Sequence, residues 1–115
     1  MASPVIQIGV RSPAEGIHIL DIQGEITRSA EGALDAAYSA AGSQAKTIVL
    51  NLGGTQSIDS HGAGLLIALQ ARARRHKQRL VAFGLSETCM RAFQLTCLDE
   101  VIGLRTDEAE ALGSL

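Results

Sequence analysis

Three consecutive residues, Asp59, Ser60 and His61, bring a carboxylate, a hydroxyl and an imidazole together in one short stretch. These are the side-chain types of a hydrolase triad, but neighbours in sequence rarely converge on one another in triad geometry. The other two histidines, His18 and His76, fall on an expected strand and in a basic run, so neither is placed to act as a base for Ser60. We therefore expect no catalytic residue and no enzyme. A small hydrolase that uses Ser60 with a distant base stays an open alternative.

Ser60 falls where a helix is expected to begin. The aliphatic run over residues 47–52 predicts a strand buried on both faces, and a helix is expected from about residue 60 to residue 77. Sites in open α/β sheets usually form where such a strand ends and the next helix starts. Free backbone N–H groups at a helix N-terminus stabilise negative charge. The sequence therefore indicates Ser60 as a position that tolerates an anionic group.

Two glycines follow this position in the first turn of the expected helix. Gly62 and Gly64 keep that turn slim, so that another surface can approach the backbone closely. Residues 62–64 do not form a phosphate-binding loop, because the Gly-Lys-Ser/Thr and Gly-x-Gly-x-x-Gly patterns are both missing. Plain helix capping by Asp59-Ser60 is the simplest alternative to a functional role.

Composition limits the classes of protein that the chain can belong to. A length of 115 residues fits one domain, residues 1–115, and a net charge of −2 with 3% aromatic residues disfavours direct binding of nucleic acid. The apolar stretches are too short to insert into a membrane and no secretory leader is visible, so a soluble cytoplasmic protein is expected. Cys89 and Cys97 match no zinc or redox spacing, so they are expected to be half-buried free thiols, and no metal or cofactor is expected.

The elements that position Ser60 alternate along the chain. Residues 11–16 and Gly53-Gly54 are interpreted as turns, Ser86 and Thr106 as helix N-caps, and Met90, Phe93 and Leu95 as apolar helix positions. Strands joined through helices imply parallel pairing, and the first two strands add an antiparallel hairpin, which together predict an α/β domain with a mixed sheet. The expected strands are 5–10, 17–22, 47–52, 79–83 and 101–104, and the expected helices are 29–41, 60–77, a segment that follows Ser86, and 107–112.

A longer pattern around Ser60 resembles the STAS domain. Leu50-Asn51-Leu52 is similar to the end of that family's hydrophobic strand, and residues 58–64, Ile-Asp-Ser-His-Gly-Ala-Gly, are similar to its signature. Gly24-Glu25-Ile26 is similar to the family's Gly-Glu-Leu turn. The resemblance covers nearly the whole chain and implies a single STAS-type domain, with a mixed, mostly parallel sheet of about five strands packed with about four helices.

The resemblance also implies a function. Members include bacterial anti-sigma factor antagonists, in which the serine after the Asp, here Ser60, is phosphorylated by a kinase that is also the anti-sigma factor. The unphosphorylated antagonist binds that serine protein kinase and frees the sigma factor, and a PP2C-type phosphatase resets the cycle. The domain itself catalyses nothing. The residues expected to contact the partner are Asp59, Ser60, His61, Gly62 and Ala63.

Three positions depart from the family pattern. His61 stands where Ser or Thr is usual, Thr27 where many phosphorylated members carry Asp, and Ser57 where an aromatic residue is common. His61 is expected to face solvent, or to steady a phosphate on Ser60. The departures at His61 and Thr27 favour an alternative function, a constitutive STAS adaptor that is never phosphorylated and belongs to a transport or signalling assembly.

The first half of the long expected helix, residues 62–69, is almost wholly apolar and is expected to be largely buried. The second half is basic, with Arg72, Arg74, Arg75, His76 and Lys77. The helix dipole stabilises positive charge at the C-terminal end of a helix. We interpret this run as a solvated helix face. The alternative is that it extends the partner-binding surface that begins at Ser60.

Overall fold

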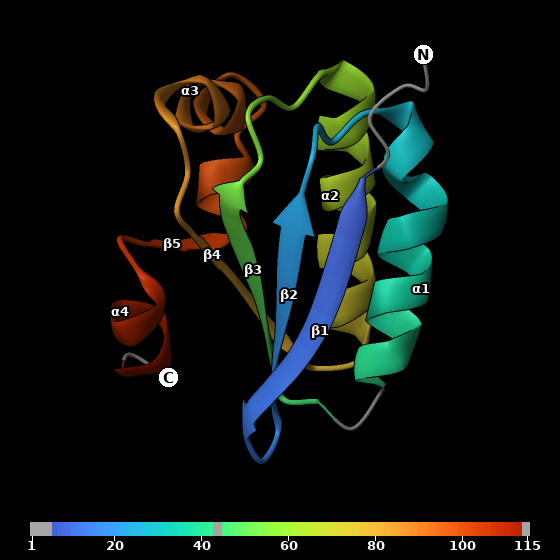
Figure 1. Ribbon diagram of the computed structural model, residues 1–115, viewed down its shortest axis with the longest axis vertical. Coiled ribbons are helices and arrows are strands. Elements are labelled where there is room, and N and C mark those ends of the chain that lie inside the picture. Colours follow the sequence, from blue (N-terminus) through green and yellow to red (C-terminus); the bar gives the residue numbers. More distant parts are fainter. Residues whose placement is uncertain (1–5, 43–44, 114–115) are drawn as a thin grey trace.

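Five strands form one sheet and follow the order in which they occur along the chain (Figure 1). The computed structural model describes residues 6–42 and 45–113. The first two strands pair antiparallel and the other neighbouring pairs are parallel, as the sequence predicts. The strands are β1 (Gln7–Ala14), β2 (Ile17–Gln23), β3 (Thr47–Gly54), β4 (Arg79–Phe83) and β5 (Gly103–Arg105).

Four α-helices connect and cover these strands, which confirms the expected α/β architecture. In Figure 1, α1 and α2 lie on one side of the sheet and α4 on the other. Two short 3-10 turns, Arg28–Ala30 and Leu98–Glu100, precede α1 and follow α3. The helices are α1 (Glu31–Ala41), α2 (Ser60–Arg75), α3 (Glu87–Leu95) and α4 (Glu108–Gly113).

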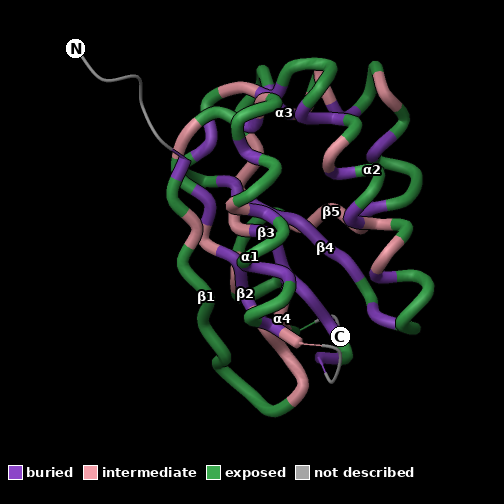
Figure 2. Tube along the Cα trace, turned by 90° about the vertical axis from the view of Figure 1, so that its right-hand side faces the viewer, coloured by how far each residue is buried: buried purple, intermediate pink, exposed green. Residues whose placement is uncertain are grey.

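The centre of the sheet is fully buried, as its aliphatic sequence predicts. Ile48, Val49 and Leu50 of β3 have no exposed surface. Alternate residues of a strand point to opposite faces, so Ile48 and Leu50 join the core with α1, α2 and α3, whereas Val49 packs in the cluster that α4 covers. Figure 2 shows β3 and β4 largely buried and β1 almost wholly exposed, so β1 is an edge strand.

One predicted turn is shorter than expected and the other is wrong. Within residues 11–16, only Glu15 and Gly16 form a turn. β1 continues through Pro13 to Ala14, because an edge strand tolerates a residue without a backbone N–H; the register shifts between Arg11 and Ala14. Gly53 and Gly54 belong to β3, which extends beyond the aliphatic run and pairs Gly54 with Gln23 of β2.

Smaller differences concern the last third of the chain. Asp107 caps α4 instead of Thr106, since Asp107 Oδ1 accepts a 2.8 Å hydrogen bond from Glu110 N. The last strand starts at Gly103, and Leu95 is 79% exposed at the end of α3. Ser86 caps α3 as predicted.

Cys89 is buried and Cys97 exposed, so neither thiol is half-buried. Val5, expected in the first strand, lies outside the described residues.

An ionic cluster ties α4 to the first hairpin. Arg11 Nη2 of β1 donates to Asp21 Oδ1 of β2 at 2.9 Å and to Glu108 Oε1 of α4 at 2.8 Å. Asn51 Nδ2 donates to the same oxygen of Asp21 at 2.7 Å. The hydrogen bond from Arg11, helped by the one from Asn51, holds the pKa of the Asp21 carboxyl below its usual value of 3.8, against the opposing effect of burial.

Asp21→Asn is expected to remove a contribution to stability that depends on pH. A carboxyl with a lowered pKa in the folded state stabilises the protein above its unfolded pKa and loses this effect as the pH falls through the folded pKa. The difference in unfolding free energy between wild type and variant should therefore be largest well above the unfolded pKa of 3.8 and shrink as the pH is lowered below it. Urea unfolding at pH values across this range measures the difference in unfolding free energy, and Asp99→Asn is the control variant. A difference that does not change with pH would contradict the lowered pKa of the Asp21 carboxyl.

Candidate functional site

The start of α2 is set by the side chain of Asp59. This residue is extended, with φ −90° and ψ −178°, and its Oδ1 accepts a 2.7 Å hydrogen bond from Gly62 N. Ala63 N donates to Asp59 O at 2.8 Å and closes the first helical turn. The expected helix start at Ser60 is confirmed, and the Asp59 carboxylate is turned onto the helix end as its cap.

Asp59→Ala is expected to lower the unfolding free energy by about 1 kcal/mol, because it leaves Gly62 N without its side-chain acceptor. Asp59→Asn should cost much less, since asparagine caps a helix about as well as aspartate does. Equilibrium urea unfolding of both variants measures the difference. Equal losses for the two variants would show that the charge, and not the capping hydrogen bond, stabilises this turn.

The chain segment that ends in Ile26 fixes the position of this turn. Ile26 O accepts from Asp59 N at 3.3 Å, Ile26 N donates to Ser57 O at 3.1 Å, and Ile26 forms a parallel β-bridge with Ile58. A Cβ atom on Gly62 would lie 1.8 Å from Ile26 O. The slim backbone at Gly62 therefore serves a contact within the domain, which the sequence analysis did not anticipate.

Burial divides the five residues expected to contact a partner into two groups. Asp59, Ser60 and His61 are exposed, whereas Gly62 and Ala63 are buried. Their roles in partner binding stay predictions, but Gly62 and Ala63 have little surface to offer.

The hydroxyl of Ser60 lies at the edge of a shallow hollow of about 390 Å³, together with His61, Gly64 and Leu65. Among residues 6–42 and 45–113, the side chains of Ser60 and His61 make no hydrogen bond with each other or with a third residue. His18 lies at the opposite end of the sheet, beside Ile48 at the start of β3. The hydroxyl is therefore open to an approaching protein, and no described side chain is hydrogen-bonded to it as a base.

His76 lies just beyond the C-terminal end of α2, where its Nδ1 is 2.9 Å from Arg72 O. It too is remote from Ser60. The arrangement gives the hydrolase alternative no support.

Thr27, one of the departures from the family pattern, lies next to this site. It follows Ile26 directly, and its Oγ1 is 3.0 Å from Ser29 Oγ, with either hydroxyl able to donate. The 3-10 turn Arg28–Ala30 that begins here packs against α2. A hydroxyl pair thus stands where many phosphorylated members of the family carry a carboxylate.

The exposed side of α2 carries no Asp, Glu, Lys or Arg from Ser60 to Ala71. Residues 62–69 were expected to be largely buried, but only part of this segment faces the core. Leu66 and Leu69 are buried, whereas Gly64 and Ala68 are exposed and Ile67 is 48% exposed. No charged residue occurs between residues 61 and 71. A surface without charges therefore leads away from the serine, and we call it the uncharged face: Ser60, Gly64, Ile67, Ala68 and Ala71.

The sequence profile described as "Mlab, STAS domain" matches residues 10–106. The chain belongs to the STAS domain family. This STAS domain is 33% identical over 57 residues to the anti-sigma-B factor antagonist of Listeria monocytogenes, and the same values hold for that of Listeria innocua. The aligned segment covers 50% of this chain and 50% of each relative, so the match spans about half the length of these curated proteins.

Solved structures share the fold. The anti-sigma factor antagonist from Mycobacterium paratuberculosis superimposes with a TM-score of 0.82 at 22% identity, over 99% of this STAS domain and 97% of that chain. A sulfate transporter family protein from Wolinella succinogenes gives 0.80 at 19% identity, over 90% and 88%. The phosphorylated form of the Bacillus cell fate determinant SpoIIAA gives 0.71 at 22% identity, over 94% and 98%.

Two further features concern metal binding and membrane insertion. Within the described part of this STAS domain, His, Cys, Asp and Glu side chains do not gather in threes as they do around a metal ion. None of the described helices has the length and apolar character of a membrane span.

Proposed function

We propose that this STAS domain is an anti-sigma factor antagonist that works by phosphorylation-dependent partner switching. With Ser60 unphosphorylated, it binds an anti-sigma factor that is also a serine protein kinase, and the sigma factor is released. The observation that carries the proposal is the exposed hydroxyl of Ser60 at the first position of α2, bordered by an uncharged helix face. The Listeria relatives, which are named anti-sigma-B factor antagonists, support the proposed antagonist role.

Phosphorylation of Ser60 would leave the domain folded. A phosphate adds about −1.5 to −2 charges. Negative charge near a helix N-terminus is stabilised by roughly 0.3–1 kcal/mol through the helix dipole. Since Ser60 is exposed, the added group displaces no packed side chain.

The same phosphate would make the surface unfavourable for the partner. It stands beside the exposed Asp59, so negative charge concentrates at one end of the uncharged face. An interface that closes over this end must desolvate the phosphate, and any acidic group opposite it is repelled. Like charges across an interface cost several kcal/mol, and each 1.4 kcal/mol is a factor of ten in affinity. Affinity can therefore be lost while the fold is kept.

The rest of the cycle needs other proteins. A PP2C-type phosphatase removes the phosphate and restores binding, and the STAS domain itself takes no catalytic part. Because the sigma factor and its anti-sigma kinase control transcription, we expect the protein to act in the cytoplasm.

A kinase assay tests the proposal. The chain is incubated with ATP and its cognate anti-sigma kinase, and the phosphate is counted by intact mass and located by peptide mass spectrometry. Wild type and Ser29→Ala should each gain one phosphate, and Ser60→Ala should gain none. Phosphate on Ser60→Ala, or none on wild type, would refute the assignment.

A second function follows from the departures at Thr27 and His61. A hydroxyl pair and an imidazole stand where the family pattern has other groups, and a sulfate transporter family protein shares the fold. These observations favour a constitutive STAS adaptor of a transport or signalling assembly. It would copurify with its assembly and carry no phosphate.

A further inference from the structure

One segment of the chain is free of acidic residues. Residues 60–86 contain no Asp or Glu, and they carry half of the ten Lys and Arg residues. The rest of the chain has a net charge of −7. The charge of this STAS domain is therefore strongly separated along the sequence. The cations of this segment are Arg72, Arg74, Arg75, Lys77 and Arg79.

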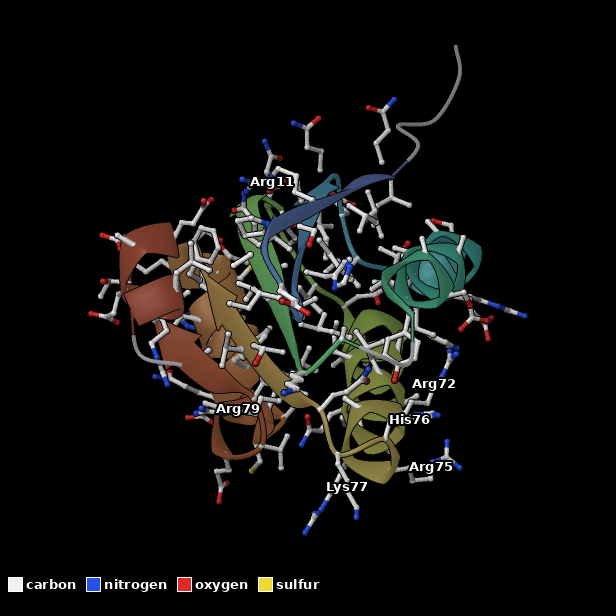
Figure 3. The ribbon with its side chains drawn as sticks, turned by 90° about the horizontal axis from the view of Figure 1, so that it is seen from below. Arg11, Arg72, Arg75, His76, Lys77 and Arg79 are labelled. Carbon is white, nitrogen blue, oxygen red and sulfur yellow. The ribbon has the colours of Figure 1, made fainter. Side chains whose placement is uncertain are left out.

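These cations gather at the end of the domain away from Ser60. Figure 3 shows Arg72, Arg75, Lys77 and Arg79 around the C-terminal end of α2 and the start of β4. α2 has 16 residues, so this end lies about 24 Å from Ser60 along the helix. It is a separate surface, too distant to belong to the hollow beside Ser60.

One of these cations is already used within the domain. Arg72 forms an ion pair with Asp35 of α1, and its guanidinium lies 4.4 Å from the centre of the Tyr38 ring. The side chains of Arg74, Arg75, Lys77 and Arg79 are exposed, and none has an ion pair among residues 6–42 and 45–113. These four are available to an external anion.

A groove of about 290 Å³ runs beside them. Gln70 and Arg74 of α2 line one side, Val101 and Arg105 the other, and Arg79 and Leu80 of β4 also contribute. β5 pairs only with Val81–Phe83, so no described strand lies beside Arg79 and Leu80 on this side of β4. The groove thus combines guanidinium groups with the exposed side chain of Val101 and an unpaired end of a strand.

The guanidinium groups and the unpaired strand end of this groove favour one class of anionic ligand over others. Guanidinium groups bind carboxylates through paired, charge-assisted hydrogen bonds, and an unpaired strand edge can accept an extended peptide. The groove has no aromatic side chain on which a nucleic acid base could stack. It is concave and lacks the Trp or Tyr anchors of a membrane-binding surface. We propose that this groove binds an extended acidic segment of a protein partner.

The test uses a defined probe, an acetylated peptide of repeated Glu-Asp, titrated into the 15N-labelled protein. Amide shifts are expected at Gln70, Arg74, Val101 and Gly103, and binding should weaken steeply as salt is raised. Arg74→Gln/Arg79→Gln should weaken it by about tenfold or more, because two charged hydrogen-bond donors are lost. Arg91→Gln, an exposed arginine on α3, should leave it unchanged.

Three results would overturn the proposal: no shifts in the groove, an equal loss with Arg91→Gln, or tighter binding of single-stranded DNA or of phosphatidylglycerol vesicles than of the peptide. The amide spectrum of each variant reports whether it is folded. The proposal does not depend on the function of Ser60, because Ser60→Asp should bind the peptide as wild type does. If the peptide does not bind the groove, the proposal of partner switching at Ser60 is therefore unaffected.

Discussion

Ser60→Asp is expected to weaken binding of the anti-sigma kinase by about 100-fold or more, whereas Ser60→Ala should bind nearly as well as wild type. The aspartate places a permanent negative charge beside Asp59, at the end of the uncharged face. A charge that must be desolvated against a like charge or an apolar surface costs several kcal/mol, and about 2.7 kcal/mol corresponds to 100-fold. Alanine only removes a hydroxyl that makes no hydrogen bond with another described residue.

Isothermal titration calorimetry with the purified kinase measures both affinities. Ser39→Asp, which adds the same charge on the exposed surface of α1, is the matched control and should bind as wild type does. Unfolding free energies of all three variants should stay close to that of the parent, because the helix N-terminus tolerates the charge at Ser60. If folded Ser60→Asp and Ser60→Ala bind equally well, charge at this position does not control the interaction.

Gly62→Ala should be the most destabilising single-methyl change at the site. The new Cβ would lie 1.8 Å from Ile26 O and 2.6 Å from Ile26 C, distances that real Cβ atoms do not adopt. Either the Ile26 segment or the first turn of α2 must move, which also weakens the Asp59–Ile26 hydrogen bond. We expect a loss of about 3 kcal/mol or more in unfolding free energy, at the upper end of the range for overpacking.

Gly64→Ala is the matched control, two residues further along the same helix. Its Cβ would meet nothing within 4 Å, and alanine favours a helix over glycine by about 1 kcal/mol. This variant should be as stable as wild type or more so. Urea unfolding compares the two, and a Gly62→Ala protein as stable as Gly64→Ala would show that the close approach of Ile26 is not required.

Hydrophobic patterns in the sequence predict most of the fold. The run Thr47 to Leu52 is buried except at Asn51, because a central strand places its β-branched and aliphatic side chains against both layers. The same patterns placed Ser60 at a helix start, whereas its phosphorylation was implied only by the resemblance to the STAS family. Residues 62–69 of α2 are less buried than predicted, because apolar composition does not separate the exposed Gly64, Ile67 and Ala68 from the buried residues of the same segment.

The contact between Ile26 and Gly62 could not be predicted from local patterns. It joins residues far apart in the sequence and depends on how closely two backbones approach. Two signals were nevertheless present: Gly24-Glu25-Ile26 after the second strand, and a glycine at the third position of a helix that Asp59 already caps. The length of β1 was missed for a different reason, because Pro13 is compatible both with a turn and with an edge strand.

The most direct test of partner switching uses protein phosphorylated stoichiometrically on Ser60. One sample serves for an amide NMR spectrum and for calorimetry with the anti-sigma kinase. We predict amide shifts confined to the start of α2 and the neighbouring Ile26 segment, an otherwise unchanged spectrum, and loss of measurable binding. Binding of the phosphorylated protein as tight as that of the unmodified protein, or a spectrum that has collapsed to that of an unfolded chain, would contradict the account.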